Sequence, residues 1–174
     1  MQTYSGAIYR YGGLAFAPVA TPTDFIVIKG SATKTVWVKR IKLIGAATAA
    51  GNMPVKAERR SDAGTIGSAV LTAVTPGKSD SADATASATV STVGTANYTT
   101  VGTTAGVVAT GRLQMTALGT GVAVEATVWE FASRIDKGIA LRGILEFLCL
   151  NLNGAAIPAG GVIDYEIEIE EVAA

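Results

Sequence analysis

A regular alternation of acidic and apolar residues stands near the end of the sequence. In the segment VIDYEIEIEEV, residues 162–172, four acidic residues occupy every second position: Asp164, Glu166, Glu168 and Glu170. Carboxylate oxygens are the ligands that hard cations such as Ca²⁺ prefer. Glycoside hydrolysis also uses two carboxyl groups, about 5–9.5 Å apart. These residue types allow a metal site or a hydrolytic site, so the geometry of the element that carries them must decide.

Strand geometry argues against both kinds of site. Side chains two positions apart in a strand point to the same side, about 6.5–7 Å from one another. Four such carboxylates form a straight row, whereas a cation needs ligands gathered around one point. The alternate positions, Tyr165, Ile167 and Ile169, make the opposite side apolar. We therefore expect one strand with a buried side and an acidic, solvent-facing side, without a metal, a cofactor or a catalytic residue.

The acidic row needs basic neighbours, because like charges in a row repel one another. Two predicted strands early in the chain, residues 34–48 and 51–61, supply candidates: Lys34, Lys39, Arg40, Lys42, Lys56, Arg59 and Arg60. An exposed ion pair between neighbouring strands is worth about 0.2–1 kcal/mol. Pairing within the chain, pairing between subunits and no pairing at all remain open alternatives.

Composition removes several classes of chemistry. The sequence contains no histidine, which excludes Ser-His-Asp and Cys-His catalysis and imidazole metal ligands. The single cysteine, Cys149, lies in the apolar stretch LEFLCLNLNG, where a buried hydrophobic residue is expected rather than a reactive thiol. We expect that the protein is not an enzyme.

Charge and hydropathy bear on the kind of partner. Fourteen basic residues match fourteen acidic ones, so there is no electrostatic case for nucleic acid. No apolar run reaches the roughly 18 residues of a membrane span. The first residues, MQTYSGAIYRYGG, lack the pattern of a secretory signal. Only 16% of the residues are charged, so we expect another protein chain to cover part of the weakly polar surface.

The pattern of the whole chain predicts an all-β fold. No apolar repeat of helical period persists, and Gly and Pro interrupt the chain at short intervals. We predict an antiparallel two-sheet sandwich of the jelly-roll type, with about eight strands; an immunoglobulin-like sandwich is the alternative. The apolar positions change parity within residues 34–48, which predicts a β-bulge or a switch of buried face. Pro54 predicts that residues 51–61 lie near a sheet edge.

Two segments have a distinct character beside the single β-sandwich domain predicted for residues 23–174. Residues 1–22 are predicted as an N-terminal arm or an edge strand; the arm would contact a partner through its aromatic residues, and the edge strand would pack on its own domain. The candidate interface residues are Tyr4, Tyr9, Tyr11, Phe16, Glu166, Glu168 and Glu170. Residues 78–106 are rich in Ser, Thr and Ala. We expect there one strand and a long loop on a neighbouring subunit, with disorder as the alternative.

The order of these features resembles that of a known family. The apolar stretches FIVIKG and KTVWVKRIKLIGAAT precede the Ser/Thr/Ala-rich middle, and LNLNGAAIPAGG leads into the alternating acidic strand. Over residues 24–172 this pattern is similar to small jelly-roll virion proteins of tailed bacteriophages, namely capsid decoration (cement) proteins and related head or tail components. The resemblance implies a homotrimer on the virion surface, made in the host cytoplasm. It also implies binding to the major capsid protein and stabilisation of the head, without a cofactor.

Other functions remain as alternatives. The chain could be a tail or fibre component, or a carbohydrate- or receptor-binding β-sandwich module, which needs aromatic residues exposed together in a concave site. It could also be a carboxylate-based hydrolase that uses Glu166 or Glu168. A Glu→Gln change there would then abolish activity and leave thermal stability unchanged.

Overall fold

The computed structural model describes residues 6–119, 123–133 and 137–173. These residues form β-strands and no helix, which confirms the prediction of an all-β fold. A membrane-crossing helix, long and apolar enough to span a bilayer, is therefore not found among them. The twelve strands are β1 (Ala7–Phe16), β2 (Asp24–Lys29), β3 (Lys34–Ala47), β4 (Gly51–Arg60), β5 (Leu71–Ala73), β6 (Gly77–Lys78), β7 (Thr89–Val93), β8 (Thr104–Ala117), β9 (Ala126–Glu130), β10 (Ile139–Arg142), β11 (Phe147–Asn151) and β12 (Val162–Ala173).

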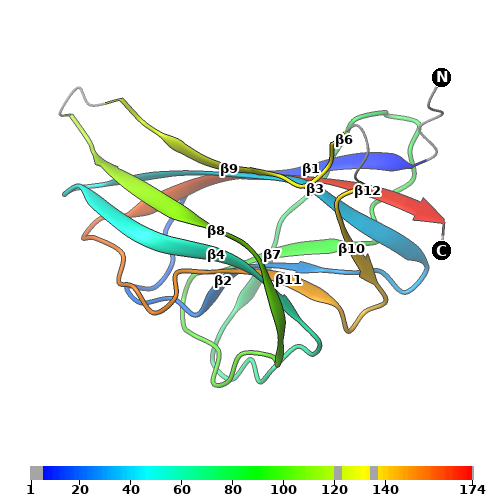
Figure 1. Ribbon diagram of the computed structural model, residues 1–174, viewed down its shortest axis with the longest axis horizontal. Helices are drawn as coiled ribbons and strands as arrows, with labels where there is room; N and C mark the ends of the chain where they lie inside the picture. Colours follow the sequence, from blue (N-terminus) through cyan, green and yellow to red (C-terminus); the bar gives the residue numbers. More distant parts are fainter. Residues whose placement is uncertain (1–5, 120–122, 134–136, 174) are drawn as a thin grey trace.

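All these strands belong to one hydrogen-bonded sheet that curls over on itself. Its order is β5-β7-β2-β11-β4-β8-β3-β12-β1-β6, and β9 and β10 also pair with β3. Figure 1 shows the two halves of the curl, with β9, β3, β12 and β1 above and β8, β4, β11 and β2 below. The finer prediction, two separate antiparallel sheets with about eight strands in all, is not supported. The end of β8 pairs with β3 in parallel, over residues 115–117 and 45–47, and so joins the halves into one sheet.

The main hydrophobic core fills the space between the two halves. From the upper half, β12 contributes Ile163, Ile167 and Ile169, each 0% exposed. From the lower half, Leu148 and Leu150 of β11 are equally buried in the same cluster. The prediction that residues 162–172 form a strand with one apolar, buried side is therefore confirmed.

A second, smaller core covers the outer side of the lower half. Val27 of β2 and Phe147 and Cys149 of β11 pack there with Ala69 and Tyr98, which lie in loops. Since β2 and β11 are buried on both sides, their sequences read as continuous apolar runs rather than as alternating ones. The Cys149 thiol is buried, as predicted. Burial, aided by the nearby charge of Asp24, raises its pKa well above the ordinary value.

The predicted parity change in β3 is a β-bulge. The pairing of β3 with β12 shifts between Glu168 and Ile169, which lie opposite Arg40 and Val38. Lys39 is the extra residue, so Lys39 and Arg40 are both half-buried in succession. At the bulge, the backbone carbonyl of Lys39 accepts two hydrogen bonds. The donors are the backbone N–H groups of Phe131 and Ala132, just after β9.

The prediction of an edge position for residues 51–61 is wrong. β4 lies between β11 and β8. β11 pairs only with residues 56–60 of β4, so Pro54 lies beyond the reach of β11 and faces Arg112 of β8. A proline at this place leaves the ladder with β11 intact, because that ladder begins at Lys56, two residues after the proline.

Gly138 shows how closely the chain crosses the bulge of β3. Its φ is +100°, a value that side chains disfavour, and an added Cβ would clash with the carbonyl oxygen of Val38. We expect Gly138→Ala to lower the free energy of unfolding by about 1–3 kcal/mol, measured by urea denaturation. Gly154→Ala is the control, because Gly154 has a φ of +78° but nothing within 4 Å of an added Cβ. Equal losses in the two variants would show that the Val38 contact has no energetic role.

Candidate functional site

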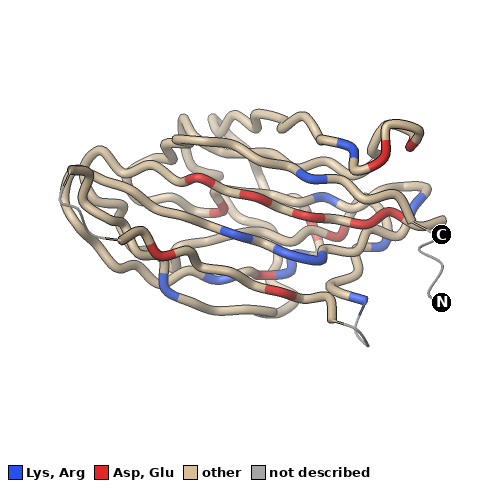
Figure 2. The backbone as a smooth tube through the Cα atoms, turned by 90° about the horizontal axis from the view of Figure 1, so that it is seen from above, with Lys and Arg blue, Asp and Glu red and all other residues tan. Residues whose placement is uncertain are grey.

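The predicted acidic row lies on the outer face of the upper half of the sheet. β12 is held between β1 and β3 and pairs with both over most of its length. Figure 2 shows the acidic positions of β12 as a line, with basic positions on the neighbouring strands at either side. The row is half-buried rather than fully solvated. Its environment is therefore set by its neighbours as well as by water.

Cross-strand ion pairs neutralise most of this row. Glu168 pairs with Arg10 of β1 at 3.0 Å, and Glu170 pairs with Lys39 of β3 at 2.6 Å. Arg40 bridges two strands, with Nη1 3.2 Å from Glu166 and Nε 2.7 Å from Glu130 of β9. We call the row and its partners the charged ladder: Arg10, Lys39, Arg40, Glu130, Glu166, Glu168 and Glu170. Of the open alternatives, pairing within the chain is therefore the one observed for these residues.

The fourth acidic residue of the row, Asp164, binds a backbone N–H group of β1. Asp164 accepts a hydrogen bond from the backbone N–H of Ala15, with a length of 2.7 Å. Ala15 has a φ of +53°, which is unusual for a residue with a side chain, and it lies where the β1–β12 register shifts between Gly13 and Phe16. Asp164 thus holds the bulged end of β1 in place. Within the described ranges no group of three or more acidic or cysteine residues is placed to hold a metal ion.

Glu171 is a buried carboxylate that the sequence reasoning missed. It is 3% exposed and lies on the core side of β12. It accepts hydrogen bonds from the backbone N–H groups of Ser87 (2.8 Å) and Ala88 (2.6 Å) and from the Ser87 hydroxyl (2.9 Å). We call residues 84–88 the strap. Glu171 therefore fixes one end of the strap to the last strand of the chain.

Two tyrosines of β1 also bind the strap. Tyr9 donates its hydroxyl hydrogen bond to the carbonyl of Ala84 (2.8 Å), and Tyr11 donates to the carbonyl of Ala88 (3.0 Å). Both side chains are only 1% exposed. Part of the Ser/Thr/Ala-rich segment is thus ordered by contacts within this chain.

The proposed interface residues of the N-terminal region are placed differently from one another. Tyr9 and Tyr11 are in the core, so their rings are covered by their own chain in this structure. Phe16 is half-buried and packs edge-on against Tyr165, with ring centroids 6.2 Å apart. Tyr4 lies outside the described residues. An interface role for the region stays a prediction. Among its described residues, Leu14 is a large apolar side chain that is 84% exposed.

The buried tyrosines predict a loss of stability at high pH. Burial raises the pKa of Tyr98 to about 12 and, with the charge of Glu171, also raises the pKa values of Tyr9 and Tyr11. An unfolded tyrosine has a pKa of about 10. The stabilisation is therefore complete below about pH 10 and is lost as the pH rises through the folded-state pKa values. In a Tyr4→Phe variant, whose remaining tyrosines are Tyr9, Tyr11, Tyr98 and Tyr165, phenolate absorbance and circular dichroism should change together. Phenolate formation near pH 10 in this folded variant would contradict the prediction.

A buried ionic network ties four strands together on the outer side of the lower half. Arg60 of β4 binds Asp24 of β2 through two hydrogen bonds, Nε to Oδ2 at 3.0 Å and Nη2 to Oδ1 at 2.8 Å. Arg60 Nη2 also lies 3.1 Å from Glu58. Thr104 of β8 accepts a hydrogen bond from Arg60 and donates one to Glu58. Asn151 of β11 donates to Asp24 at 3.0 Å.

Glu58 and Arg60 of this network stabilise one another's charged form. Arg60, Asp24 and Glu58 are each no more than 5% exposed. Burial pushes the pKa of Glu58 up, but the hydrogen bond from Thr104 and the nearby charges of Lys56 and Arg60 outweigh burial and lower it. The stability from Glu58 is therefore present above its unfolded-state pKa and is lost as the pH falls through the lower, folded-state pKa. The network is structural in character, because its polar groups face one another.

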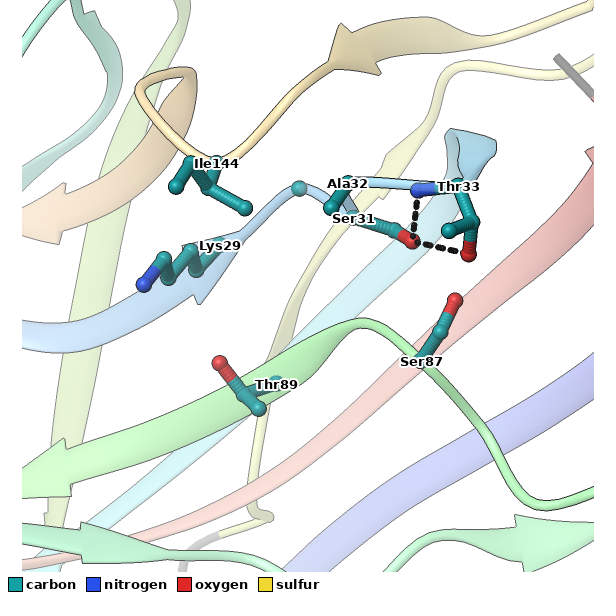
Figure 3. A pocket seen from close by; sticks show the side chains of 8 residues that line it. Lys29, Ser31, Ala32, Thr33, Ser87, Thr89 and Ile144 are labelled. Carbon is teal, nitrogen blue, oxygen red and sulfur yellow. Dashed lines mark hydrogen bonds between the residues drawn. The ribbon is translucent and has the colours of Figure 1, made fainter.

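A small polar pocket opens between the end of β2 and the start of β7. Its volume is about 240 Å³ and its lining residues are Lys29, Gly30, Ser31, Ala32, Thr33, Ser87, Thr89 and Ile144. Figure 3 shows the Ser87 hydroxyl directed toward the Thr33 side, while Lys29 and Ile144 lie at the other end. Ser31 and Thr33 are already engaged with each other, since the Ser31 hydroxyl accepts from the Thr33 N–H at 3.1 Å.

Comparison with known proteins does not add to this geometry. No protein-family model matches the sequence, no curated protein matches it, and no solved structure matches its fold. The resemblance to phage decoration proteins therefore stays a prediction.

Proposed function

We propose that this protein is a structural virion protein, a homotrimeric capsid decoration protein that binds the assembled coat lattice and stabilises the head. Its mechanism is binding alone. Interfaces of roughly 800 Å² per partner, repeated over a lattice, hold neighbouring subunits in register by multivalency. The curled sheet, whose two halves enclose one core, serves in this proposal as the rigid two-layered body expected of a jelly roll.

The observation that carries the proposal is the set of large aliphatic side chains left exposed around this body. Within the described part of the chain they are Leu14, Ile66, Val70, Val107, Leu118, Val124, Val128, Ile144 and Leu145. Leu14, Leu118 and Leu145 are 84%, 69% and 63% exposed, and they belong to β1, the turn after β8 and the loop before β11. Exposed aliphatic surface on separate elements suits a protein that contacts several neighbours at once. The charged ladder supports the proposal too, because its ion pairs leave little net charge to repel another subunit.

Purified virus particles test the proposal directly. Mass spectrometry and cryo-EM of particles carrying this chain are expected to find it in a copy number comparable to that of the coat protein. A few copies per particle would place it in the tail or neck instead. Light scattering of the isolated protein is expected to give the mass of a trimer, and a monomer across micromolar concentrations would count against the proposal.

A second candidate function is a carbohydrate- or receptor-binding module, and the polar pocket is the observation in its favour. Its lysine and its hydroxyl groups are of the kinds that hold a sugar. A glycan array separates the two functions: binding that Thr89→Ala weakens would favour the module, and the absence of binding would remove it.

A further inference from the structure

A cationic and aromatic cluster lies at one end of the charged ladder. Trp37 is half-buried on the outer face of β3, two residues before the bulge at Lys39. Ala140 of β10 lies opposite it on one side and Glu170 of β12 on the other. The indole ring is therefore held between two strands and presents part of its surface to the outside.

Two positive charges lie against this ring. Lys137 Nζ is 5.8 Å and Arg142 Cζ is 5.6 Å from its centroid, within the range of cation–π interactions. Both side chains are exposed. Arg10, Lys39 and Arg40 of the charged ladder each have a carboxylate partner, whereas no described carboxylate lies within ion-pair distance of either Lys137 or Arg142.

Local packing explains why these charges stay unmatched. Glu146 is the described acidic residue nearest to Arg142 along the chain, but its Oε2 accepts the hydrogen bond of the Arg142 backbone N–H and that of Arg59 Nη2. Glu170, opposite Trp37, forms an ion pair with Lys39, in which Nζ lies 2.6 Å from Oε2. Among the described residues, the cluster of Trp37, Lys137 and Arg142 therefore carries a net positive charge.

We propose that Trp37, Lys137 and Arg142 form a docking surface for a short acidic segment of a partner protein. Trp and Arg are the residue types most enriched among interface residues that dominate binding energy. The acidic row of β12 begins on the adjacent strand, so a long continuous polyanion such as nucleic acid would run into like charge, whereas a short segment would not. This inference rests on the proposed function as an assembly protein. It adds the chemistry of the partner, which is a short acidic segment.

Fluorescence of Trp37 tests this surface. The chain has two tryptophans, so Trp129→Phe leaves Trp37 as the reporter, and the probe is a short oligoglutamate peptide. We expect a saturable change in emission that weakens with added salt. In this background, Lys137→Gln with Arg142→Gln is expected to weaken binding about tenfold or more. The control is Lys42→Gln with Arg112→Gln, which removes the same charge elsewhere and should leave affinity unchanged.

Each contrary outcome overturns the inference. These outcomes are no emission change with peptide, equal weakening in the control pair, or equally tight binding of an oligothymidylate of the same charge. A concentration-dependent self-association that disappears with Arg142→Gln would assign the surface to a second copy and would also overturn it. Copy number in particles is measured separately, so the docking surface can fail while the proposed function stands.

Discussion

Replacement of Arg60 by alanine is expected to lower the free energy of unfolding by about 3–5 kcal/mol. Arg60 is the centre of the buried network. Its loss removes the cation that binds the buried Asp24 carboxylate and one of the two cations beside Glu58, the other being Lys56. An uncompensated buried charge costs far more than the broken pair was worth. Urea denaturation followed by circular dichroism measures the change.

The neighbouring arginine provides the control. Arg59 pairs with Glu146 at 2.9 Å, but both side chains are about a third exposed, so Arg59→Ala should cost less than about 1 kcal/mol. A double-mutant cycle with Asp24→Ala separates the pairwise term, and we expect the double variant to lose less than the sum of the single losses. Similar small losses for Arg59→Ala and Arg60→Ala would contradict the role given to the network.

Replacement of Glu171 by alanine is expected to cost about 2–4 kcal/mol and to free the strap. The substitution removes the acceptor for the backbone N–H groups of Ser87 and Ala88, and each buried donor left unpaired costs about 1–3 kcal/mol. Hydrogen exchange of these two amides should accelerate more than exchange in the centre of β12.

A carboxylate on the other side of the same strand is the matched control. Glu168 pairs with Arg10, whose side chain is 59% exposed, so Glu168→Ala should change stability by less than about 1 kcal/mol and leave the strap amides protected. If Glu168→Ala exposes the strap as much as Glu171→Ala does, the effect belongs to β12 as a whole and not to the Glu171 hydrogen bonds. This control also bears on a hydrolase, for which Glu168 would affect activity alone.

Local sequence patterns predicted the features that depend on neighbouring residues of the same strand. The alternation through Ile167 and Ile169 predicted the buried side of β12, because side-chain direction in a strand has a period of two. The parity change across Arg40 predicted the bulge for the same reason. The edge position predicted from Pro54 was wrong because the prediction assumed that the neighbouring strand is as long as β4. The sequence of β4 does not give the length of β11 beside it.

The features that the sequence did not predict depend on contacts between residues far apart in the chain. Glu171 sits at a position where the alternation calls for an apolar residue, and only the strap, more than eighty residues earlier, explains a carboxylate there. Arg60 was read as a possible partner of the acidic row, since its charge is visible but its burial against Asp24 is not. The strap looked weak because its residues are small, yet its order comes from Tyr9, Tyr11 and Glu171.

The position of β12 has a consequence for how the chain reaches this structure. β12 follows the other described strands in the sequence, yet it lies between β3 and β1, which come early in the chain. During synthesis the apolar sides of β1 and β3 therefore have no partner between them until residues 162–173 have left the ribosome. Such non-local pairing is slow, and it leaves the nascent chain prone to aggregation while it waits. The pairing of β12 with β1 and β3 consequently forms only after residues 162–173 have been made, in a late step that joins segments far apart in the sequence.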